Sequence, residues 1–338
     1  MAALFDTVAL IGVGLIGSSL ARALRARGLA RELVGCARTE ATRAKLIELK
    51  LVERVHADPA DAVAGADLVV ICTPLSTYAE IARAIGPRLE PGAIVTDVGS
   101  VKMSTLRDVL PHLPPGIAFV PGHPVAGTEH SGPEAGFAEL FQGRFCILTP
   151  TPSTDPKAVE RVSELWRRVG SRVELMDPAH HDRVLATTSH LPHLIAYTIV
   201  GTATELEGQL RAAARAGQES GDRVEQAEVI KFSAGGFRDF TRIAASDPVM
   251  WRDIFLANRE AVLEMLARFT EDLTALQRAI RFGEADKLET WFRRTREIRR
   301  GIVKAGQAGT FQPTEPINKA AGAAPAPPAR GKPSRPRG

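Results

Sequence analysis

Residues 7–28 read TVALIGVGLIGSSLARALRARG, an apolar run that turns into a helical pattern across three glycines. Gly12, Gly14 and Gly17 are spaced as G-x-G-x-x-G. In this spacing the first glycine allows a tight turn, the second lets the backbone approach a pyrophosphate, and the third lets the helix pack against the strand. We expect the helix to begin near Ser18 and to point its N–H groups and positive dipole end at the phosphates. The stretch therefore predicts a strand, a phosphate-binding turn and a helix.

The flanking sequence strengthens this motif, which alone is weak evidence. A strand-like run precedes the glycines, an amphipathic helix pattern follows them, and ELVGCAR at residues 32–38 supplies a second strand. This context favours a dinucleotide site over a glycine turn of purely structural use. We expect the cofactor to contact Gly12, Gly14, Leu15, Ile16 and Gly17.

The alternation of strands and helices continues beyond the motif. Apolar runs that resemble buried strands are ADLVVICTP (66–74), GAIVTDVGS (92–100), IAFVPG (117–122) and RFCILTP (144–150). Strands separated by helices predict an α/β fold with a mainly parallel, doubly wound Rossmann-type sheet. Ligands of such sheets bind outside the carboxyl ends of the strands. We therefore expect Thr73, Pro74 and Asp97 to line the cofactor site, with the loop around His123 opposite.

The pattern becomes all-helical after Pro178. Long stretches with helical spacing cover residues 180–206, 248–280 and 285–306, and Pro192 is tolerated as a kink. We expect a dinucleotide-binding domain over residues 1–176, a helical substrate and dimerisation domain over 177–304, and a disordered tail over 305–338. The apolar positions after Pro248 exceed what one buried face needs, which predicts a homodimer.

The net charge of +4 comes from the C-terminal tail. From Lys319 onward the chain holds five basic residues and no acidic one, and the remainder has 38 basic against 39 acidic residues. The Ala/Pro-rich tail cannot bury enough apolar surface to order itself. A solvated extension is therefore favoured over a nucleic-acid-binding arm.

Cysteine usage and hydropathy bear on the compartment. Cys36, Cys72 and Cys146 are odd in number and show no CxxC spacing, which argues against disulfides and against a zinc site. We expect no signal peptide and no membrane span, because the first residues lack a basic segment and no apolar run reaches the roughly 18 residues of a membrane span. We expect a cytoplasmic protein with no membrane partner.

His123 lies in PGHPVAGTEHSG, residues 121–132, among glycines and prolines. An imidazole can be neutral at working pH and acts as a base when it is held within hydrogen-bond reach. A stiff loop of small residues would hold it and let a substrate approach closely. The alternative is a histidine that merely caps the end of a strand.

Six segments together closely resemble prephenate dehydrogenases and their relatives that act on arogenate or on both cyclohexadienyl substrates. The segments are GVGLIGSSLA, CTPL, TDVGSVK, PGHPVAGTEHSG, SHLPHLIAY and GGFRDFTRIAASDPVMWRDI, and the resemblance runs from about Val8 to about Arg300. Without the resemblance, the residues indicate no more than a nicotinamide-type oxidoreductase with a helical substrate domain. The resemblance implies oxidative decarboxylation of prephenate, arogenate or both in tyrosine biosynthesis, with hydride transfer to NAD(P), and tyrosine as a competitive inhibitor.

The resemblance also implies roles for individual residues. His123 becomes the proton acceptor, and Ser100 hydrogen-bonds the substrate 4-hydroxyl, although a serine there could instead cap the following helix. Arg242 recognises a carboxylate, because its planar guanidinium forms bidentate pairs. The substrate would also be contacted by His193, Trp251 and Arg238, for which core packing (Trp251) and a surface ion pair with Asp239 (Arg238) are the alternatives.

We expect no metal ion. His190 and His193 lie three residues apart on one helical face, but no acidic or cysteine ligand nearby completes a site, and hydride transfer needs none.

The end of the second strand bears on the choice between NAD and NADP. An NAD site normally has Asp or Glu there, where this chain has Cys36, Ala37 and Arg38. Arg38 could pair with a 2′-phosphate and Thr39 could donate a hydroxyl, so NADP is favoured over NAD. Alternatively, Arg38 stacks on the adenine or stays solvated.

Two rival functions remain open. One is a beta-hydroxyacid dehydrogenase of similar architecture, and the other is a non-catalytic NAD(P)-binding regulatory protein. The presence of His123, Ser100 and Arg242 together argues against the second.

Overall fold

The computed structural model describes residues 3–128, 130–217 and 232–304. The predicted disordered tail, residues 305–338, lies outside the described residues. Within the described ranges no helix is long and apolar enough to cross a membrane. The described residues divide into two compact units, the first ending at Thr270 and the second beginning at Glu271.

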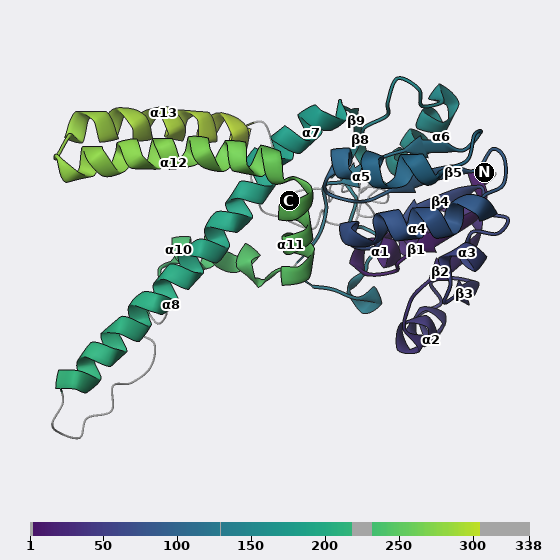
Figure 1. The fold of residues 1–338 in the computed structure, drawn as a ribbon, viewed down its shortest axis with the longest axis horizontal. Helices are drawn as coiled ribbons and strands as arrows, with labels where there is room; N and C mark the ends of the chain where they lie inside the picture. The colour runs from purple at the N-terminus through teal and green to yellow at the C-terminus, as the bar shows by residue number, and fades with distance from the viewer. Residues whose placement is uncertain (1–2, 129, 218–231, 305–338) are drawn as a thin grey trace, which may run out of the picture. The chain divides into compact units, whose positions relative to one another are not determined.

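The first unit contains a six-stranded sheet in which every neighbouring pair is parallel, as the sequence predicts (Figure 1). The strand order is β3-β2-β1-β4-β5-β6. The strands are β1 Phe5–Ile11, β2 Ala30–Cys36, β3 Arg54–His56, β4 Leu68–Ile71, β5 Ile94–Asp97 and β6 Ala118–Val120. The order reverses between β1 and β4, and ligands of such sheets bind in the crevice at this switch point.

The central strands are apolar without interruption because both faces of the sheet are covered. Val8 and Leu10 of β1 belong to one buried cluster, whereas Ala9 and Ile11 belong to another. The first cluster includes residues of α1 (Leu15–Ala26) and α6 (Pro156–Arg168). The second includes residues of α3 (Pro59–Ala62), α4 (Tyr78–Ile85) and α5 (Lys102–Val109), and α4 and α5 lie side by side (Figure 1).

A second sheet departs from the single mainly parallel sheet that the pattern predicts. Its order is β7-β8-β9, with β7 (Gly122–Pro124) antiparallel to β8 (Phe145–Leu148), and β8 parallel to β9 (Arg172–Leu175). Pro121 has no N–H to extend the ladder of β6, and the chain changes sheets there. His123 therefore lies on a short strand opposite Ile147, and the prediction that it lies on a loop is wrong.

Helices follow β9, as predicted. They are α7 Pro178–Leu185, α8 Leu191–Gly217, α10 Gly235–Thr241, α11 Pro248–Ala257, α12 Arg259–Arg281 and α13 Ala285–Lys304. Residues 186–190 form a π-helical turn between α7 and α8. Pro192 has no N–H and its ring crowds the carbonyl of Thr188, so the wider turn accommodates the proline.

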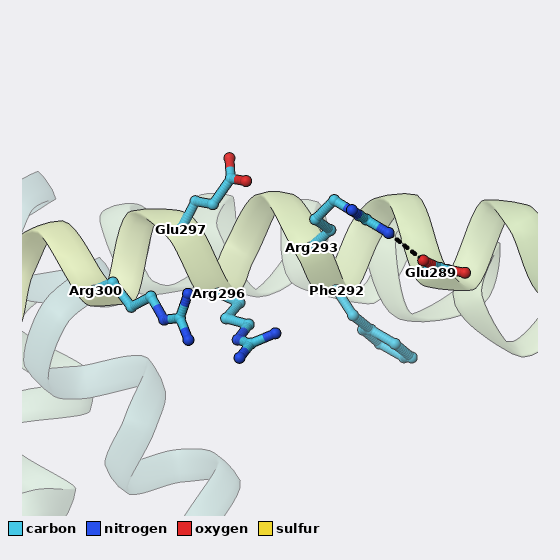
Figure 2. Close-up of a pocket in the computed structure, with 6 residues that line it drawn as sticks. All are labelled: Glu289, Phe292, Arg293, Arg296, Glu297 and Arg300. Carbon is cyan, nitrogen blue, oxygen red and sulfur yellow. Dashed lines mark hydrogen bonds and ion pairs between the residues drawn. The ribbon is translucent and has the colours of Figure 1, made fainter.

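The second unit holds the end of α12 and the whole of α13. Figure 2 shows a pocket along α13, where Arg293 is paired with Glu289. The residues that line it are Glu289, Phe292, Arg293, Arg296, Glu297 and Arg300. All six come from one helix, and none is a predicted site residue.

Candidate active site

The glycine turn has the geometry that a dinucleotide site needs. Gly12 has a φ of +84°, and a Cβ there would lie 2.5 Å from Thr73 Cγ2 on the neighbouring strand end. A Cβ on Gly17 would lie 2.7 Å from the carbonyl oxygen of Gly12, so this glycine permits close packing. At Gly14, by contrast, no described atom lies within 4 Å of the Cβ position. Open space at the second glycine is what a bound pyrophosphate requires.

The helix after this turn begins at Leu15, one turn earlier than the sequence suggests. Its N-cap is Gly14, which has no side chain to satisfy the free N–H groups of the first turn. Those N–H groups and the positive end of the helix dipole suit a phosphate. The residues of this turn therefore fit a dinucleotide. Thr73 lies half-buried beside it and its hydroxyl accepts from Thr77, while Pro74 is exposed.

Two arginine residues lie near the end of β2. Arg38 is exposed, and Arg43 Nη1 donates to the carbonyls of Ala37 at 2.9 Å and Arg38 at 2.8 Å. Thr39 caps α2 (Glu40–Glu48) by accepting from the Thr42 N–H at 3.2 Å. The sequence analysis did not predict a role for Arg43. This residue lies in the first turn of the next helix and hydrogen-bonds the backbone at the end of the strand.

A buried ion pair links the ends of β5 and β7. Lys102 Nζ donates to Asp97 Oδ2 and to the carbonyl of Gly122, each at 2.6 Å, and both charged side chains are fully buried. Asp97 Oδ1 accepts from the Gly122 N–H at 3.1 Å, and Oδ2 also accepts from the Gly99 N–H at 2.8 Å. The pair fixes the backbone immediately before His123. Contact between Asp97 and a cofactor stays a prediction, and the enclosure of its carboxylate favours an indirect role.

His123 is buried, with 8 % of its surface exposed. Its Nδ1 lies 2.8 Å from Nε2 of His181, a residue of α7. Burial, together with the positive charge that His181, Lys102 and His190 can carry, holds the pKa of His123 well below its usual value. The imidazole is therefore neutral near pH 7, the state that a general base requires.

Ser100 lies half-buried in the turn between β5 and α5. The N-cap of α5 is Val101, so Ser100 does not cap this helix. The cap comes instead from Asp182 of α7, whose Oδ1 accepts from the Lys102 N–H at 2.8 Å and whose Oδ2 accepts from the Met103 N–H at 2.9 Å. This arrangement leaves the Ser100 hydroxyl out of the cap.

The structure brings His193 and Trp251 together. Their rings stack at a centroid distance of 3.6 Å and an interplanar angle of 23°. His193 Nδ1 lies 2.9 Å from the carbonyl of Ser189, so Nδ1–H donates and Nε2 keeps its lone pair. Burial lowers the pKa of His193, and the nearby charge of Arg242 lowers it further. The imidazole is thus neutral and lies within electrostatic range of the predicted carboxylate clamp.

Arg242 is exposed at the start of a short 3-10 helix, Arg242–Ala245. The Tyr197 hydroxyl donates to the carbonyl of Ser246 at 2.8 Å and so fixes the end of this helix. Arg238 is exposed on α10, where its Nε donates to Ser233 Oγ at 3.3 Å. Arg242 therefore lies within electrostatic range of His193 in the His193–Trp251 pair. The contact shown for Arg238 is with a residue five positions away in the sequence.

Helix α11 contacts the carboxyl ends of the central strands. Trp251 and Ile254 form a buried cluster with Val101, against which Leu75 packs. Ser76 Oγ, beyond β4, donates to Asp253 Oδ2 at 2.5 Å. The helical segment therefore covers the end of the sheet where the predicted site residues gather.

Asn258, between α11 and α12, joins two further elements. Its Nδ2 donates to the carbonyl of Asp182 at 2.8 Å and lies 3.1 Å from His190 Nδ1. Burial lowers the pKa of His190 to about 4, so the ring is neutral. Since Nδ1 accepts from Asn258, the ring proton is on Nε2. In the part of the chain that is described, no group of three or more His, Cys, Asp or Glu residues could hold a metal ion.

Comparison with known proteins gives consistent matches over most of the chain. The family models that match are those of the prephenate dehydrogenase nucleotide-binding domain, over residues 20–175, and the prephenate dehydrogenase dimerization domain, over residues 177–294. A cyclohexadienyl dehydrogenase of Zymomonas mobilis is 41 % identical over 87 % of this chain and 95 % of its own length.

Solved structures agree with the family models. A crystal structure of prephenate dehydrogenase from A. aeolicus, in complex with hydroxyphenyl propionate and NAD+, has a TM-score of 0.78 and 35 % identity, and the match covers 88 % of this chain and 98 % of that one. Arogenate dehydrogenase from Synechocystis has a TM-score of 0.70 and 29 % identity, and the match covers 87 % and 99 %.

Proposed function

The chain belongs to the prephenate dehydrogenase family, and from that premise we propose that it oxidatively decarboxylates prephenate, arogenate or both with a nicotinamide cofactor. The product would be 4-hydroxyphenylpyruvate from prephenate or tyrosine from arogenate. The observation that carries the proposal is the buried, neutral imidazole of His123, beside the end of the sheet where the glycine turn offers a phosphate site.

The reaction needs a hydride acceptor and a proton acceptor. A nicotinamide held at the glycine turn would supply the acceptor for the hydride that leaves the carbinol carbon of the substrate. His123 accepts the proton of the 4-hydroxyl, and the Ser100 hydroxyl positions that oxygen. The resulting dienone is a vinylogous β-keto acid, so the bond to the ring carboxylate can break and CO2 leaves. The electron pair of that bond passes through the ring to the C4 oxygen, which regains a proton from the His123 cation, and the ring becomes aromatic. Arg242 would hold a substrate carboxylate, with His193 and Trp251 beside it.

A steady-state assay that crosses both substrates with both cofactors tests this proposal. Prephenate and arogenate are each supplied with NAD+ and with NADP+, and the absorbance of the reduced nicotinamide is followed. Turnover of at least one combination supports the proposal. Turnover of a beta-hydroxyacid and of neither cyclohexadienyl substrate would favour the rival dehydrogenase, and cofactor binding without any turnover would favour the regulatory protein.

Replacing Arg242 by Ala should mainly raise the KM for the substrate, because a carboxylate clamp acts in the ground state and the transition state alike. The value of kcat should change little. Steady-state kinetics measure both constants, and Arg183→Ala, an exposed arginine of α7, is the matched control. An unchanged substrate KM with a collapsed nicotinamide affinity would contradict this role.

For the cofactor, we propose that NADP is accepted and is preferred to NAD. Arg38 is exposed just beyond β2, the guanidinium of Arg43 is bonded to the same strand end, and no carboxylate immediately follows the strand to repel a 2′-phosphate. Arg38→Ala should then lower kcat/KM for NADP more than for NAD. The control is Arg27→Ala, an exposed arginine at the end of α1. Strict NAD use that the Arg38 variant leaves unchanged would refute the assignment.

We also propose that the protein is a homodimer. Large apolar side chains after Pro248 remain exposed in the single chain, including Leu256 at 67 % and Leu263 at 56 %. A partner chain would bury such surfaces. Light scattering at micromolar concentration should give twice the mass of one chain, and a clean monomer would contradict the proposal.

Two further expectations, inhibition by tyrosine and a cytoplasmic location, are supported by the sequence analysis alone. Tyrosine shares a ring, a 4-hydroxyl and a carboxylate with the substrate or product, so it should compete with the substrate at millimolar concentration. A cytoplasmic location is the other expectation, based on an odd number of cysteines without CxxC spacing.

A further inference from the structure

A line of buried hydrogen bonds extends behind His123, away from its Nε2. His123 Nδ1 lies 2.8 Å from His181 Nε2, and His181 Nδ1 lies 2.8 Å from Asp182 Oδ1. His181 is fully buried and Asp182 is 4 % exposed. The three side chains come from β7 and α7, which are far apart in sequence. None of the predicted roles uses His181 or Asp182.

The direction of these hydrogen bonds follows from Asp182. Its two oxygens accept from the backbone N–H groups of Lys102 and Met103, so the carboxylate is a hydrogen-bond acceptor held at the start of α5. An ionised carboxylate cannot donate, so the contact with Asp182 requires the ring proton of His181 on Nδ1. Nε2 of His181 then carries a lone pair and accepts from Nδ1–H of His123.

This order of protons leaves one free basic atom on the neutral ring of His123. Nδ1 is protonated and engaged, so only Nε2 can take a proton. We propose that His181 and Asp182 are positioning residues that fix His123 as the tautomer with a basic Nε2 and stabilise the cation formed when His123 takes the proton of the substrate hydroxyl. The assignment rests on the proposed role of His123 as the base.

The proton balance of the step is simple. The O–H bond of the substrate breaks, an N–H bond forms at Nε2, and the electron pair of the O–H bond stays on the substrate oxygen. Nδ1–H of His123 continues to donate to His181, whose other nitrogen faces the Asp182 carboxylate. The new positive charge is therefore connected to a negative group through one imidazole.

Such a connection is needed because the other surroundings oppose the cation. Burial disfavours a charged ring, and the ammonium group of Lys102 adds positive potential. The carboxylate of Asp97 is already paired with Lys102. The other ionisable groups that bear on the two rings are Lys102, His190, Asp97 and Asp182. The thiol of Cys146 lies nearby and interacts with the backbone of His123. Asp182 is the carboxylate that reaches His123 through a hydrogen bond to His181.

Asp182→Asn is the sharpest variant. An amide has one oxygen, which can accept, and one NH2 group, which can only donate. It therefore cannot replace both carboxylate oxygens, which accept from the two backbone N–H groups and from His181. If the amide NH2 turns to His181, that ring reverses its tautomer, donates to His123 Nδ1, and drives the proton of His123 onto Nε2. We expect kcat to fall by about 10² to 10⁴, as for a triad histidine held in the wrong tautomer, with the KM for the nicotinamide unchanged.

A series at His181 separates positioning from packing. His181→Phe removes the acceptor for Nδ1–H of His123, whereas the amide oxygen of His181→Gln can replace it. We expect His181→Gln to retain more kcat than His181→Phe. His180→Gln, an exposed histidine of the same helix, is the matched control and should resemble the wild type.

The direct readout is the ¹⁵N chemical shift of the His123 ring nitrogens in the full-length protein with nicotinamide bound. The wild type should show Nδ1 protonated and Nε2 basic, and Asp182→Asn should reverse or mix the two. The acid limb of kcat/KM for residual activity should move to lower pH, because loss of the carboxylate lowers the pKa of His123 further. Wild-type shifts and wild-type kcat in both Asp182→Asn and His181→Phe would overturn the inference. The NMR readout needs no substrate, so it stands even if neither cyclohexadienyl substrate is turned over.

Discussion

Replacing His123 by Asn should lower kcat by about 10² or more and leave nicotinamide binding intact. The asparagine amide is not a base, so the proton of the substrate hydroxyl would have to leave to water in a buried site. The glycine turn that would hold the pyrophosphate is a separate part of the sheet and is unchanged by the substitution. Stopped-flow kinetics would give kcat, and fluorescence titration would give the Kd for the nicotinamide.

The matched control for this variant is His130→Asn. His130 lies in the same segment, residues 121–132, but its side chain is exposed. The control should keep the activity of the wild type. A His123→Asn protein with near-normal kcat would remove His123 from the mechanism, and equal losses in both variants would indicate a disturbed segment.

Replacing Lys102 by Met should lower the free energy of unfolding by about 3–5 kcal/mol. The variant leaves the carboxylate of Asp97 buried without its cation, and it also removes the hydrogen bond from Nζ to the carbonyl of Gly122. Urea denaturation followed by circular dichroism measures the loss. Activity should fall as well, because the same pair fixes the backbone before His123.

A surface pair and a double variant serve as controls for Lys102. Lys45 pairs with Glu48 at 2.8 Å near solvent, and Lys45→Met should leave the free energy of unfolding almost unchanged. If Lys102→Met does not fold, the double variant Asp97→Asn, Lys102→Met should recover folded protein, because it removes both buried charges together. A loss below 1 kcal/mol in Lys102→Met would contradict the account.

The nucleotide half could be predicted because its signals are local. Gly12, Gly14 and Gly17 lie within six residues, and each has a steric role that spacing alone reveals. The buried strands were recognisable because both faces of a parallel sheet are covered, which leaves uninterrupted apolar runs. The second sheet was missed because its parts are only three or four residues long, and their partners depend on where the chain turns at Pro121.

The surroundings of the predicted base could not be predicted. His181 meets His123 across 58 residues of sequence, and Asp182 caps a helix that begins 80 residues earlier. The sequence does not distinguish a solvated Lys102 from a buried one, and only the structure shows that its side chain is buried against Asp97. A pattern shows which residue types are present, whereas burial and ring tautomers follow from long-range packing.

The central claim is that this site couples hydride transfer to loss of the ring carboxylate. The most direct test supplies prephenate or arogenate labelled with ¹³C in the ring carboxylate, with excess NAD+ or NADP+, and measures labelled CO2 and reduced nicotinamide in the same sample. We expect one CO2 for each reduced nicotinamide with at least one substrate, and neither product above background in His123→Asn. Reduced nicotinamide without CO2, or no product from either substrate with either cofactor, would contradict the account.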